Sequence, residues 1–433
     1  MTRRTLTIAM PVILLVCSSL VVRGDNWPRF RGPNGTGVSH DKNIPVKWTE
    51  KNILWKTRLP GLGNSSPIVW ENRVFVQSAP GDDSRALIAV DAIDGKIVWI
   101  QSVPGKKAHI HPRNSLASST PATDGERVYC LFWDGENVDL HAFDFQTGKP
   151  LWKHSLGSFT SQHGAGHSPI VYNGKVIINK DQDRYTKGEE NLPNFKGRTS
   201  QLVAVDARTG KEVWSVDRQA FRVSYSTPLL VKTGNRDELI VTTSLGVTGY
   251  DPDTGKQLWH WNWKFYRPVM RTVGSPIYSE GIVFVGSGDG SGARHFIAVK
   301  KGESGDVSKT NLVWEKTKPR STPYVPTALA RGPYIYYVND IGVAGCWEAK
   351  TGKQIWEQRL GGGFSSSPVM IDGKIYAVNE AGQVYVFAAE PEFKLLAKND
   401  IGEPCKASPA VANGRLYIRG RDHLFCIGQP AGQ

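Results

Sequence analysis

Cysteine, methionine and several catalytic signatures are scarce or missing in this chain of 433 residues, which has five cysteines and four methionines. No Cys-x-x-Cys or Cys-x-x-Cys-His pattern occurs, which excludes zinc ribbons and c-type haem attachment. Gly-x-Ser-x-Gly, the Walker phosphate loop and a paired-carboxylate signature are absent too, so the common hydrolase and nucleotide-binding motifs give no support. Disorder is excluded because 39% of the residues are hydrophobic and 10% are aromatic.

A long hydrophobic run occurs at one place, near the N-terminus. Residues 8–22 are almost wholly apolar and follow Arg3 and Arg4. This run of about fifteen residues is shorter than the roughly twenty that a membrane span needs. The pattern is typical of a Sec-type signal peptide, which we predict over residues 1–24 with cleavage before Asp25. The mature protein is then expected to be periplasmic or secreted, with no transmembrane segment.

Two alternatives for this segment stay open. Cys17 allows a lipid anchor, although Val16 stands where a small residue is expected, and the arginine pair allows twin-arginine export, although the following residues fit it poorly. Loss of residues 1–24 removes three arginines and no acid, which lowers the formal charge from +13 to +10. Such a balance permits nucleic acid, anionic lipid or acidic ligands as partners without deciding among them.

Tryptophan is present in excess, with 14 copies. Many copies end an eleven-residue pattern, Ala-x-Asp-x-x-Thr-Gly-Lys-x-x-Trp, which first appears, with Asp for Thr, at residues 89–99. Its Gly can take positive φ and its Asp can bond turn amides, so the motif predicts a tight hairpin. Further copies, of which the last is looser, span residues 142–152, 204–214, 249–259 and 346–356; residues 298–314 carry an insertion and residues 387–396 lack the Trp.

A second marker precedes each copy: a Ser or Thr next to a proline, followed by two short apolar runs. These prolines are spaced by 41 to 59 residues and are Pro67, Pro121, Pro169, Pro228, Pro276, Pro326, Pro368 and Pro409. The first unit reads as four strands over residues 66–70, 73–78, 86–91 and 96–102. Eight such units predict an all-β, eight-bladed β-propeller, because a sandwich needs about 100 residues per closed core.

The two ends predict how the ring closes. The last unit stops at Gly428 after three strands, while an unpartnered Trp strand lies at residues 52–59. If this N-terminal strand completes the last blade, no sheet edge is left unmatched. We therefore predict a leader over residues 25–51, one propeller domain over 52–428 and a tail over 429–433. The structural tryptophans of the repeat are Trp55, Trp99, Trp152, Trp214, Trp259, Trp314 and Trp356.

Four cysteines follow the predicted signal: Cys130, Cys346, Cys405 and Cys426. An exported protein can oxidise its cysteines. Cys405 and Cys426 fall in the same terminal repeat and are candidates for a disulfide. The alternative is four buried thiols.

The repeated motif resembles the tryptophan-docking motif of PQQ-like (pyrroloquinoline quinone-type) eight-bladed propellers, a family that includes quinoprotein dehydrogenases and the BamB-type assembly subunit. The resemblance covers roughly residues 50–428, and it implies that each docking Trp packs on the neighbouring blade. Residues 26–37 also look like the leader of exported PQQ-like repeat proteins. Similarity of fold does not carry over the chemistry.

The chain departs from the dehydrogenases of that family in ways that bear on the cofactor. It has no Cys-Cys pair and little length beyond the blades. The family's Ca²⁺ site cannot be matched residue by residue, so PQQ with Ca²⁺ is an open cofactor without support from ligand residues. Asp181, Asp183 and Asp289 are candidate oxygen ligands, with solvated loops as the alternative.

Propellers bind ligands in the central funnel, on the loops that lead into each innermost strand. These loops are rich in cations and imidazoles, so the positive charge is expected to gather at one channel mouth. The candidate rim residues are His109, His111, Arg113, His163, His167, Arg222, Tyr225, Arg267, Arg271, Arg320, Tyr324 and Lys406. The alternative is that the arginines are solvated and the histidines bond backbone. The His163–His167 spacing lies in a glycine loop, so no metal site is predicted.

The longest insertion, residues 181–200, lies on the same face as a candidate lid or docking loop. We expect an exported binding scaffold whose basic funnel takes a protein, or an anionic small molecule or glycan. The alternative is a PQQ-dependent dehydrogenase of an alcohol or sugar. Nucleic acid is not expected as a partner, because the chain lacks a repeat of basic and aromatic residues.

Overall fold

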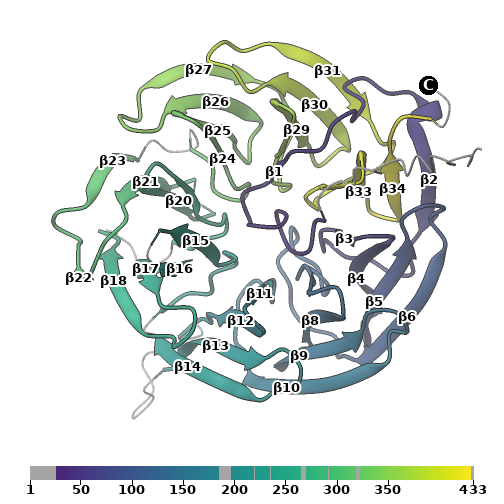
Figure 1. Ribbon diagram of the computed structural model, residues 1–433, viewed down its shortest axis with the longest axis horizontal. Coiled ribbons are helices and arrows are strands. Elements are labelled where there is room, and N and C mark those ends of the chain that lie inside the picture. The colour runs from purple at the N-terminus through teal and green to yellow at the C-terminus, as the bar shows by residue number, and fades with distance from the viewer. Residues whose placement is uncertain are drawn as a thin grey trace, which may run out of the picture.

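The computed structural model describes residues 26–184, 197–218, 220–234, 236–264, 270–290, 292–317 and 322–430. Strands dominate this part of the chain, in which the single helix is the three-residue 3-10 helix η1 (Glu50–Asn52). The strands form eight sheets arranged as a ring of blades (Figure 1). The predicted all-β fold, an eight-bladed propeller of four-stranded blades, is confirmed.

Each blade runs outward from a short inner strand to an outer strand, and consecutive strands of a blade pair antiparallel. Blades 1 to 4 consist of β3 (Ile68–Trp70), β4 (Arg73–Gly81), β5 (Ser84–Asp91), β6 (Ile97–Pro104); β7 (Ala122–Thr123), β8 (Arg127–Trp133), β9 (Asn137–Asp144), β10 (Pro150–Ser158); β11 (Ile170–Tyr172), β12 (Lys175–Lys180), β13 (Ser200–Asp206), β14 (Glu212–Arg218); and β15 (Leu229–Thr233), β16 (Arg236–Thr242), β17 (Gly246–Tyr250), β18 (Gln257–Asn262).

Blades 5 to 8 follow the same plan. They consist of β19 (Ile277–Ser279), β20 (Ile282–Gly288), β21 (Arg294–Lys300), β23 (Leu312–Lys316); β24 (Leu329–Arg331), β25 (Tyr334–Val338), β26 (Val343–Glu348), β27 (Gln354–Arg359); β28 (Val369–Ile371), β29 (Lys374–Val378), β30 (Gln383–Ala388), β31 (Leu395–Asp400); and β32 (Ala410–Ala412), β33 (Arg415–Arg419), β34 (His423–Ile427), β2 (Ile53–Arg58). Two further short strands, β1 (Val38–Ser39) and β22 (Gly305–Asp306), add to blades 7 and 4.

The middle strands of a blade are buried on both faces, whereas the outer strand is not. In β5 all five residues from Ala86 to Val90 have an exposed fraction of 0%. Neighbouring blades cover both faces of this strand, so its sequence is an unbroken apolar run. The outer strand β6 is largely exposed, and along it partly buried residues alternate with exposed ones. No blade can therefore form its core without its neighbours.

Docking tryptophans join each blade to the next. Trp55 lies over Gly95 of blade 1, where an added Cβ would come within 2.6 Å of the indole, and its Nε1 donates to the Ala92 carbonyl at 3.1 Å. The same indole-on-glycine contact recurs in the pairs Trp99–Gly148, Trp152–Gly210, Trp214–Gly255 and Trp314–Gly352. Each of these glycines has φ between +69° and +77°, a conformation that L side chains rarely adopt. The turn glycine thus serves both the hairpin and the blade interface.

Trp259 and Trp356 depart from this pattern. Trp259 meets Gly302 of the inserted copy and donates to Glu238 Oε2 at 3.0 Å within its own blade. Trp356 lies against Phe387 and Phe393 in the copy that lacks a Trp. Phenylalanine rings therefore face the indole where the motif has decayed.

The ring is closed by a strand from the N-terminal side of the propeller. β2 pairs antiparallel with β34 and becomes the outer strand of blade 8, with Trp55 opposite Cys426. This is the arrangement that the truncated last repeat predicts. Because Trp55 also contacts Gly95, it joins the last blade to the first.

A belt of hydroxyl side chains runs around the inner wall of the ring. We define the hydroxyl belt as the Ser or Thr at each proline marker: Ser66, Thr120, Ser168, Thr227, Ser275, Thr327, Ser367 and Ser408. At seven of the eight junctions in this described belt, the backbone N–H of one member donates to the Oγ of the next, at 2.9–3.1 Å. The last of these bonds, from Ser408 to Ser66, crosses the closure. The marker hydroxyl therefore satisfies a buried backbone donor of the preceding blade.

The leader packs into the ring instead of lying outside it. Trp27 exchanges two backbone hydrogen bonds with Val69 of blade 1, and β1 pairs in parallel with β28 of blade 7. Between them Arg31, which is 2% exposed, donates to the carbonyls of Ala328 at 2.8 Å and Pro368 at 3.1 Å. The leader thus covers one end of the central channel, where its purple trace crosses the ring in Figure 1.

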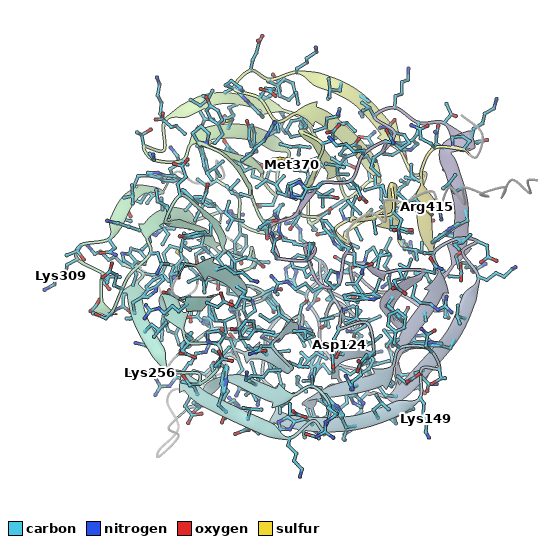
Figure 2. The ribbon with its side chains drawn as sticks, in the orientation of Figure 1. Asp124, Lys149, Lys256, Lys309, Met370 and Arg415 are labelled. Atoms are coloured by element: carbon cyan, nitrogen blue, oxygen red, sulfur yellow. The ribbon has the colours of Figure 1, made fainter. Side chains whose placement is uncertain are left out.

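The structure specifies two details that the sequence left open. Part of the insertion at residues 303–306 forms β22, which pairs in parallel with β18 and extends blade 4. Cys130, Cys346, Cys405 and Cys426 are all buried and free, so the disulfide considered for Cys405 and Cys426 is not formed. The lysines of two motif turns are peripheral, and Figure 2 shows Lys149 and Lys256 at the outer edge of the ring.

The indole contact at the blade interface predicts a stability difference between two glycines. Gly148 and Gly174 both have φ +71°, but a Cβ at 148 would meet the Trp99 ring at 2.6 Å, whereas a Cβ at 174 has no heavy atom within 4 Å. We expect Gly148→Ala to lower the free energy of unfolding by about 1–3 kcal/mol more than Gly174→Ala. Urea unfolding followed by tryptophan fluorescence measures both. Equal losses would show that the indole contact contributes nothing.

The hydroxyl belt gives a second prediction. Thr327→Val keeps the side-chain shape but removes the acceptor of the Ser275 N–H, which lies at 2.9 Å. A buried donor without a partner costs about 1–3 kcal/mol, so we expect a loss of that size in the same unfolding assay. Thr199→Val, at an exposed position, is the control. A Thr327 variant as stable as this control would contradict a stabilising role for the belt.

Candidate functional site

A cavity of about 610 Å³ lies on the ring axis and is lined by residues of all eight blades. Seven belt members contribute to its wall: Ser66, Thr120, Ser168, Thr227, Thr327, Ser367 and Ser408. Phe30 of the leader also lines it. Because the leader covers one end of the channel, the cavity is a cup that opens toward the loops before the inner strands. Its volume is in the range typical of small-molecule sites.

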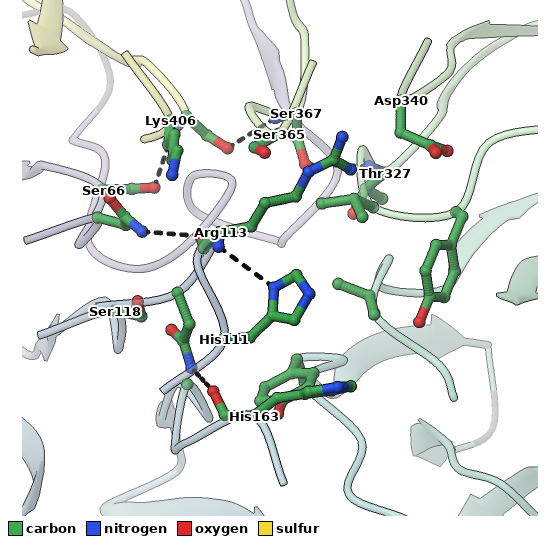
Figure 3. A pocket seen from close by; sticks show the side chains of 18 of the residues that line it. Ser66, His111, Arg113, Ser118, His163, Thr327, Asp340, Ser365, Ser367 and Lys406 are labelled. Carbon is green, nitrogen blue, oxygen red and sulfur yellow. Dashed lines mark hydrogen bonds between the residues drawn. The ribbon is translucent and has the colours of Figure 1, made fainter. Parts of the chain in front are cut away.

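Six predicted rim residues line this cup: His111, Arg113, His163, Tyr225, Tyr324 and Lys406. The loops that carry them are tied together across blades. Asn114 donates to the His163 carbonyl at 2.6 Å, and Lys406 Nζ donates to the Pro112 carbonyl at 2.9 Å. Figure 3 shows Lys406, Arg113, His111 and His163 gathered in this one region.

Arg271 and Arg222 lie in an adjoining recess of about 280 Å³, together with Gln162 and His163. Arg271 is buried and ion-paired with Asp183 at 3.1 Å, and Arg222 Nη1 is 3.7 Å from the same carboxylate. Asp183 is 0% exposed. The predicted rim contained cations and no carboxylate, so the ion pairing of these arginines with Asp183 is seen only in the structure.

The two cup imidazoles have a defined protonation pattern. Arg271 Nε donates to His163 Nδ1 at 3.1 Å, and the Arg113 backbone N–H donates to His111 Nδ1 at 3.2 Å. In a neutral imidazole the other nitrogen then carries the proton. Burial, and next the Arg271 charge, lower the pKa of His163 to about 4, while burial and the Arg113 charge lower the pKa of His111. Both rings are therefore neutral Nε2–H donors near pH 7.

The remaining predicted rim residues lie elsewhere. His167 is 1% exposed and its Nε2 lies 3.0 Å from the Asp181 carbonyl, so it belongs to the wall between blades 2 and 3. His109 is exposed but is not among the cavity-lining residues. Arg267 and Arg320 lie outside the described residues, as does most of the predicted lid, residues 185–196.

Much of the positive charge is structural. Arg29, Arg31, Arg85 and Arg419 are buried, and the printed acceptors of their guanidinium groups are carbonyl and hydroxyl oxygens on neighbouring segments. Burial lowers the pKa of Arg31 and of Arg419 to about 9 each. Arg419 reaches from blade 8 to the Gln77 carbonyl of blade 1, and thus holds the closure. These side chains cannot contribute to an exposed basic rim.

Two of the three candidate calcium ligands are already engaged, whereas the third, Asp289, lines the cup. Asp181 is ion-paired with Arg218, and Asp183 with Arg271, and both carboxylates are 0% exposed. Burial raises the pKa of Asp181 to about 6 even though Arg218 opposes this shift. Within the described ranges, no group of three or more His, Cys, Asp or Glu side chains could hold a metal ion. The residues present therefore do not fit a calcium-assisted quinone site.

The predicted site did not include the hydroxyl belt or Phe30 of the leader, although both line the cavity. The belt leaves a signal in the sequence, because Ser or Thr recurs beside proline in every unit. Arg294, which is ion-paired with Asp340 at 2.7 Å and lies 4.5 Å from the Tyr324 ring, carries no such signal. Its place at the cup depends on how blades 5 and 6 meet.

A family model described as "Outer membrane protein assembly factor BamB" matches residues 38–184, 113–326 and 306–391. The chain belongs to this family. In the described part of this family member, no helix is long and apolar enough to cross a membrane.

Individual relatives are distant. The chain is similar to outer membrane protein assembly factor BamB of Shewanella oneidensis, with 24% identity over 64% of this chain and 66% of that protein. It is also similar to polyvinylalcohol dehydrogenase of a Pseudomonas species, with 28% identity over 37% of this chain and 24% of that protein. The match thus spans about two thirds of the first relative and a quarter of the second.

Solved structures show the same fold. Quinohemoprotein alcohol dehydrogenase from Comamonas testosteroni superposes with a TM-score of 0.66 at 14% identity, covering 94% of this chain and 81% of that one. BamB from Moraxella catarrhalis superposes with a TM-score of 0.58 at 15% identity, covering 88% of this chain and 97% of that one. At such identities the likeness shows the fold alone.

The lowered pKa of His163, about 4 in the folded protein, predicts an acid-sensitive term in stability. Between the unfolded pKa of about 6.5 and the folded value, the unfolded chain binds more protons, so stability falls as pH drops through this window. Asp181, whose pKa is raised to about 6, acts in the opposite direction, and a variant comparison cancels it.

We therefore expect wild type to lose more thermal stability than His163→Asn between pH 6.5 and 4, because Asn keeps an acceptor for Arg271 without gaining a proton. Melting temperatures of both proteins across this range, referenced to pH 7.5, provide the measurement. Parallel profiles would show that His163 titrates alike in the folded and unfolded states.

Proposed function

We propose that this protein is an exported, non-catalytic propeller scaffold whose loop face and central cup hold a protein partner or an anionic ligand. The observation that supports this most directly is the cup itself, a cavity of about 610 Å³. Loops from several blades are bonded to one another around its mouth. Such a preformed concave site needs little ordering when a ligand binds.

Family membership supports the scaffold part of the proposal. The matching model and the Shewanella relative are named as outer membrane assembly factors, which act through other proteins by that description. The proposed export depends on the predicted signal over residues 1–24, which lies outside the described residues. We also propose that the mature protein is periplasmic or secreted.

A PQQ-dependent dehydrogenase of an alcohol or sugar is the second candidate, because one relative is named polyvinylalcohol dehydrogenase. Against this candidate, Asp183 already forms a buried ion pair with Arg271 and is therefore not available as a metal ligand. Releasing Asp183 to a metal would leave a buried guanidinium uncompensated, which is costly. The scaffold is therefore the better supported of the two functions.

Calorimetry with PQQ and Ca²⁺, together with a dye-linked dehydrogenase assay, separates the two candidates. For the scaffold we expect no PQQ binding at concentrations of about tens of micromolar, which corresponds to a dissociation constant weaker than that range. No reduction of the dye with alcohols or sugars should occur. Robust turnover after reconstitution would reject the scaffold, with His163→Asn and Arg271→Lys as site controls.

A further inference from the structure

Lys406 differs in its partners from the arginines of the cup and of the adjoining recess. Arg271, Arg294 and Arg113 each have a carboxylate within 4 Å, namely Asp183, Asp340 and Glu380. The Lys406 ammonium donates to the Pro112 carbonyl at 2.9 Å, and no carboxylate of the described residues lies within 4 Å of it. A partly buried cation bonded only to a neutral oxygen attracts one negative charge.

Neutral donors reinforce this position. The imidazole rings of His111 and His163 are neutral and donate through Nε2–H, because their Nδ1 atoms accept hydrogen bonds from the Arg113 backbone N–H and from Arg271 Nε. The two rings contact edge to face, with centroids 4.8 Å apart. The Lys406 charge also reaches His111, where it is among the causes that lower the imidazole pKa. One side of the cup therefore offers a cation together with imidazole N–H donors.

The belt gives the lower wall of the cup a second kind of chemistry. Six of the belt hydroxyls that line the cavity already accept a backbone N–H: Ser66, Thr120, Ser168, Thr327, Ser367 and Ser408. Among the described residues no hydrogen bond is donated by these six hydroxyls, so each can donate to a ligand in the cavity. A ligand with many oxygen acceptors satisfies such a ring of donors.

The opposite side of the cup combines apolar surface with an ion pair. Tyr324, Val325, Val273 and Ile341 line the cavity together with Asp340 and Arg294, and Figure 3 shows Asp340 across the cavity from Lys406. Asp340 adds carboxylate oxygens that can accept from ligand hydroxyls. A ring with polar edges and apolar faces can pack on Tyr324 while its hydroxyls meet the belt.

We propose, on the basis of the scaffold function above, that the cup binds a small monocarboxylate bearing several hydroxyl groups, as a sugar acid does. Its carboxylate pairs with Lys406 and accepts from the His111 and His163 Nε2–H groups. Its hydroxyls exchange hydrogen bonds with the belt and with Asp340. The single uncompensated cation selects one negative charge, and the floor at Phe30 limits the length of the ligand.

Titration calorimetry with D-glucuronate, with D-glucose and acetate as comparison ligands, tests this proposal. We expect D-glucuronate to bind saturably and the two comparison ligands to bind at least about tenfold more weakly, since each lacks one of the two recognised features. Lys406→Met should weaken glucuronate about tenfold, the loss of one charge-assisted hydrogen bond. Lys149→Met, in an exposed outer turn, is the matched control and should bind as wild type.

Lys406→Arg guards against a merely structural effect, because it keeps the cation and should bind within about threefold of wild type. The proposal is overturned if D-glucuronate, D-galacturonate and D-gluconate all fail to bind at about 10 mM. It is equally overturned if Lys406→Met binds like wild type. Binding of sulfate or an acidic peptide that depends on Lys406, without sugar-acid binding, rejects this ligand class but leaves the scaffold function standing. If none of these anions binds, the anionic-ligand part of the scaffold proposal fails too.

Discussion

The need of every blade for a neighbour is the constraint on which the rest of this structure depends. A four-stranded sheet with both faces apolar cannot be solvated, so the ring must close. Two sets of contacts hold neighbouring blades in register: an indole over a turn glycine near the outer edge, and the hydroxyl belt at the inner wall. Trp55 and the Ser66–Ser408 pair extend both sets across the point where the ends of the propeller meet.

The same contacts create the site. The belt that ties the inner strands together also lines the cup, and its hydroxyl oxygens accept the backbone N–H groups that join neighbouring blades. Arg31 and Arg29 fix the leader beneath the belt through carbonyl oxygens and thereby turn an open channel into a cup. Stability and binding chemistry are thus properties of one layer of the molecule, and a belt substitution is expected to affect both.

The net charge of the chain does not describe the charge of the cup. The excess of Lys and Arg predicted a basic funnel, yet Arg85 and Arg419 bridge blades through carbonyl groups and Arg271 is neutralised by Asp183. The cup therefore does not have a continuous basic rim. It has Lys406, a cation without a carboxylate partner among the described residues, next to neutral imidazole donors.

The sequence by itself determined the number of blades, their strand pattern and the closing strand, because each depends on local repeats: the Thr-Gly-Lys turn, the docking Trp and the proline marker. It also located the loops that carry His111, Arg113, His163 and Lys406. Only the tertiary structure decided which side chains meet, since Asp183 pairs with Arg271 across 88 residues and Lys406 reaches Pro112 across 294. Contacts between distant blades leave no periodic trace, so the leader floor and the distribution of charge appear only once the ring is closed.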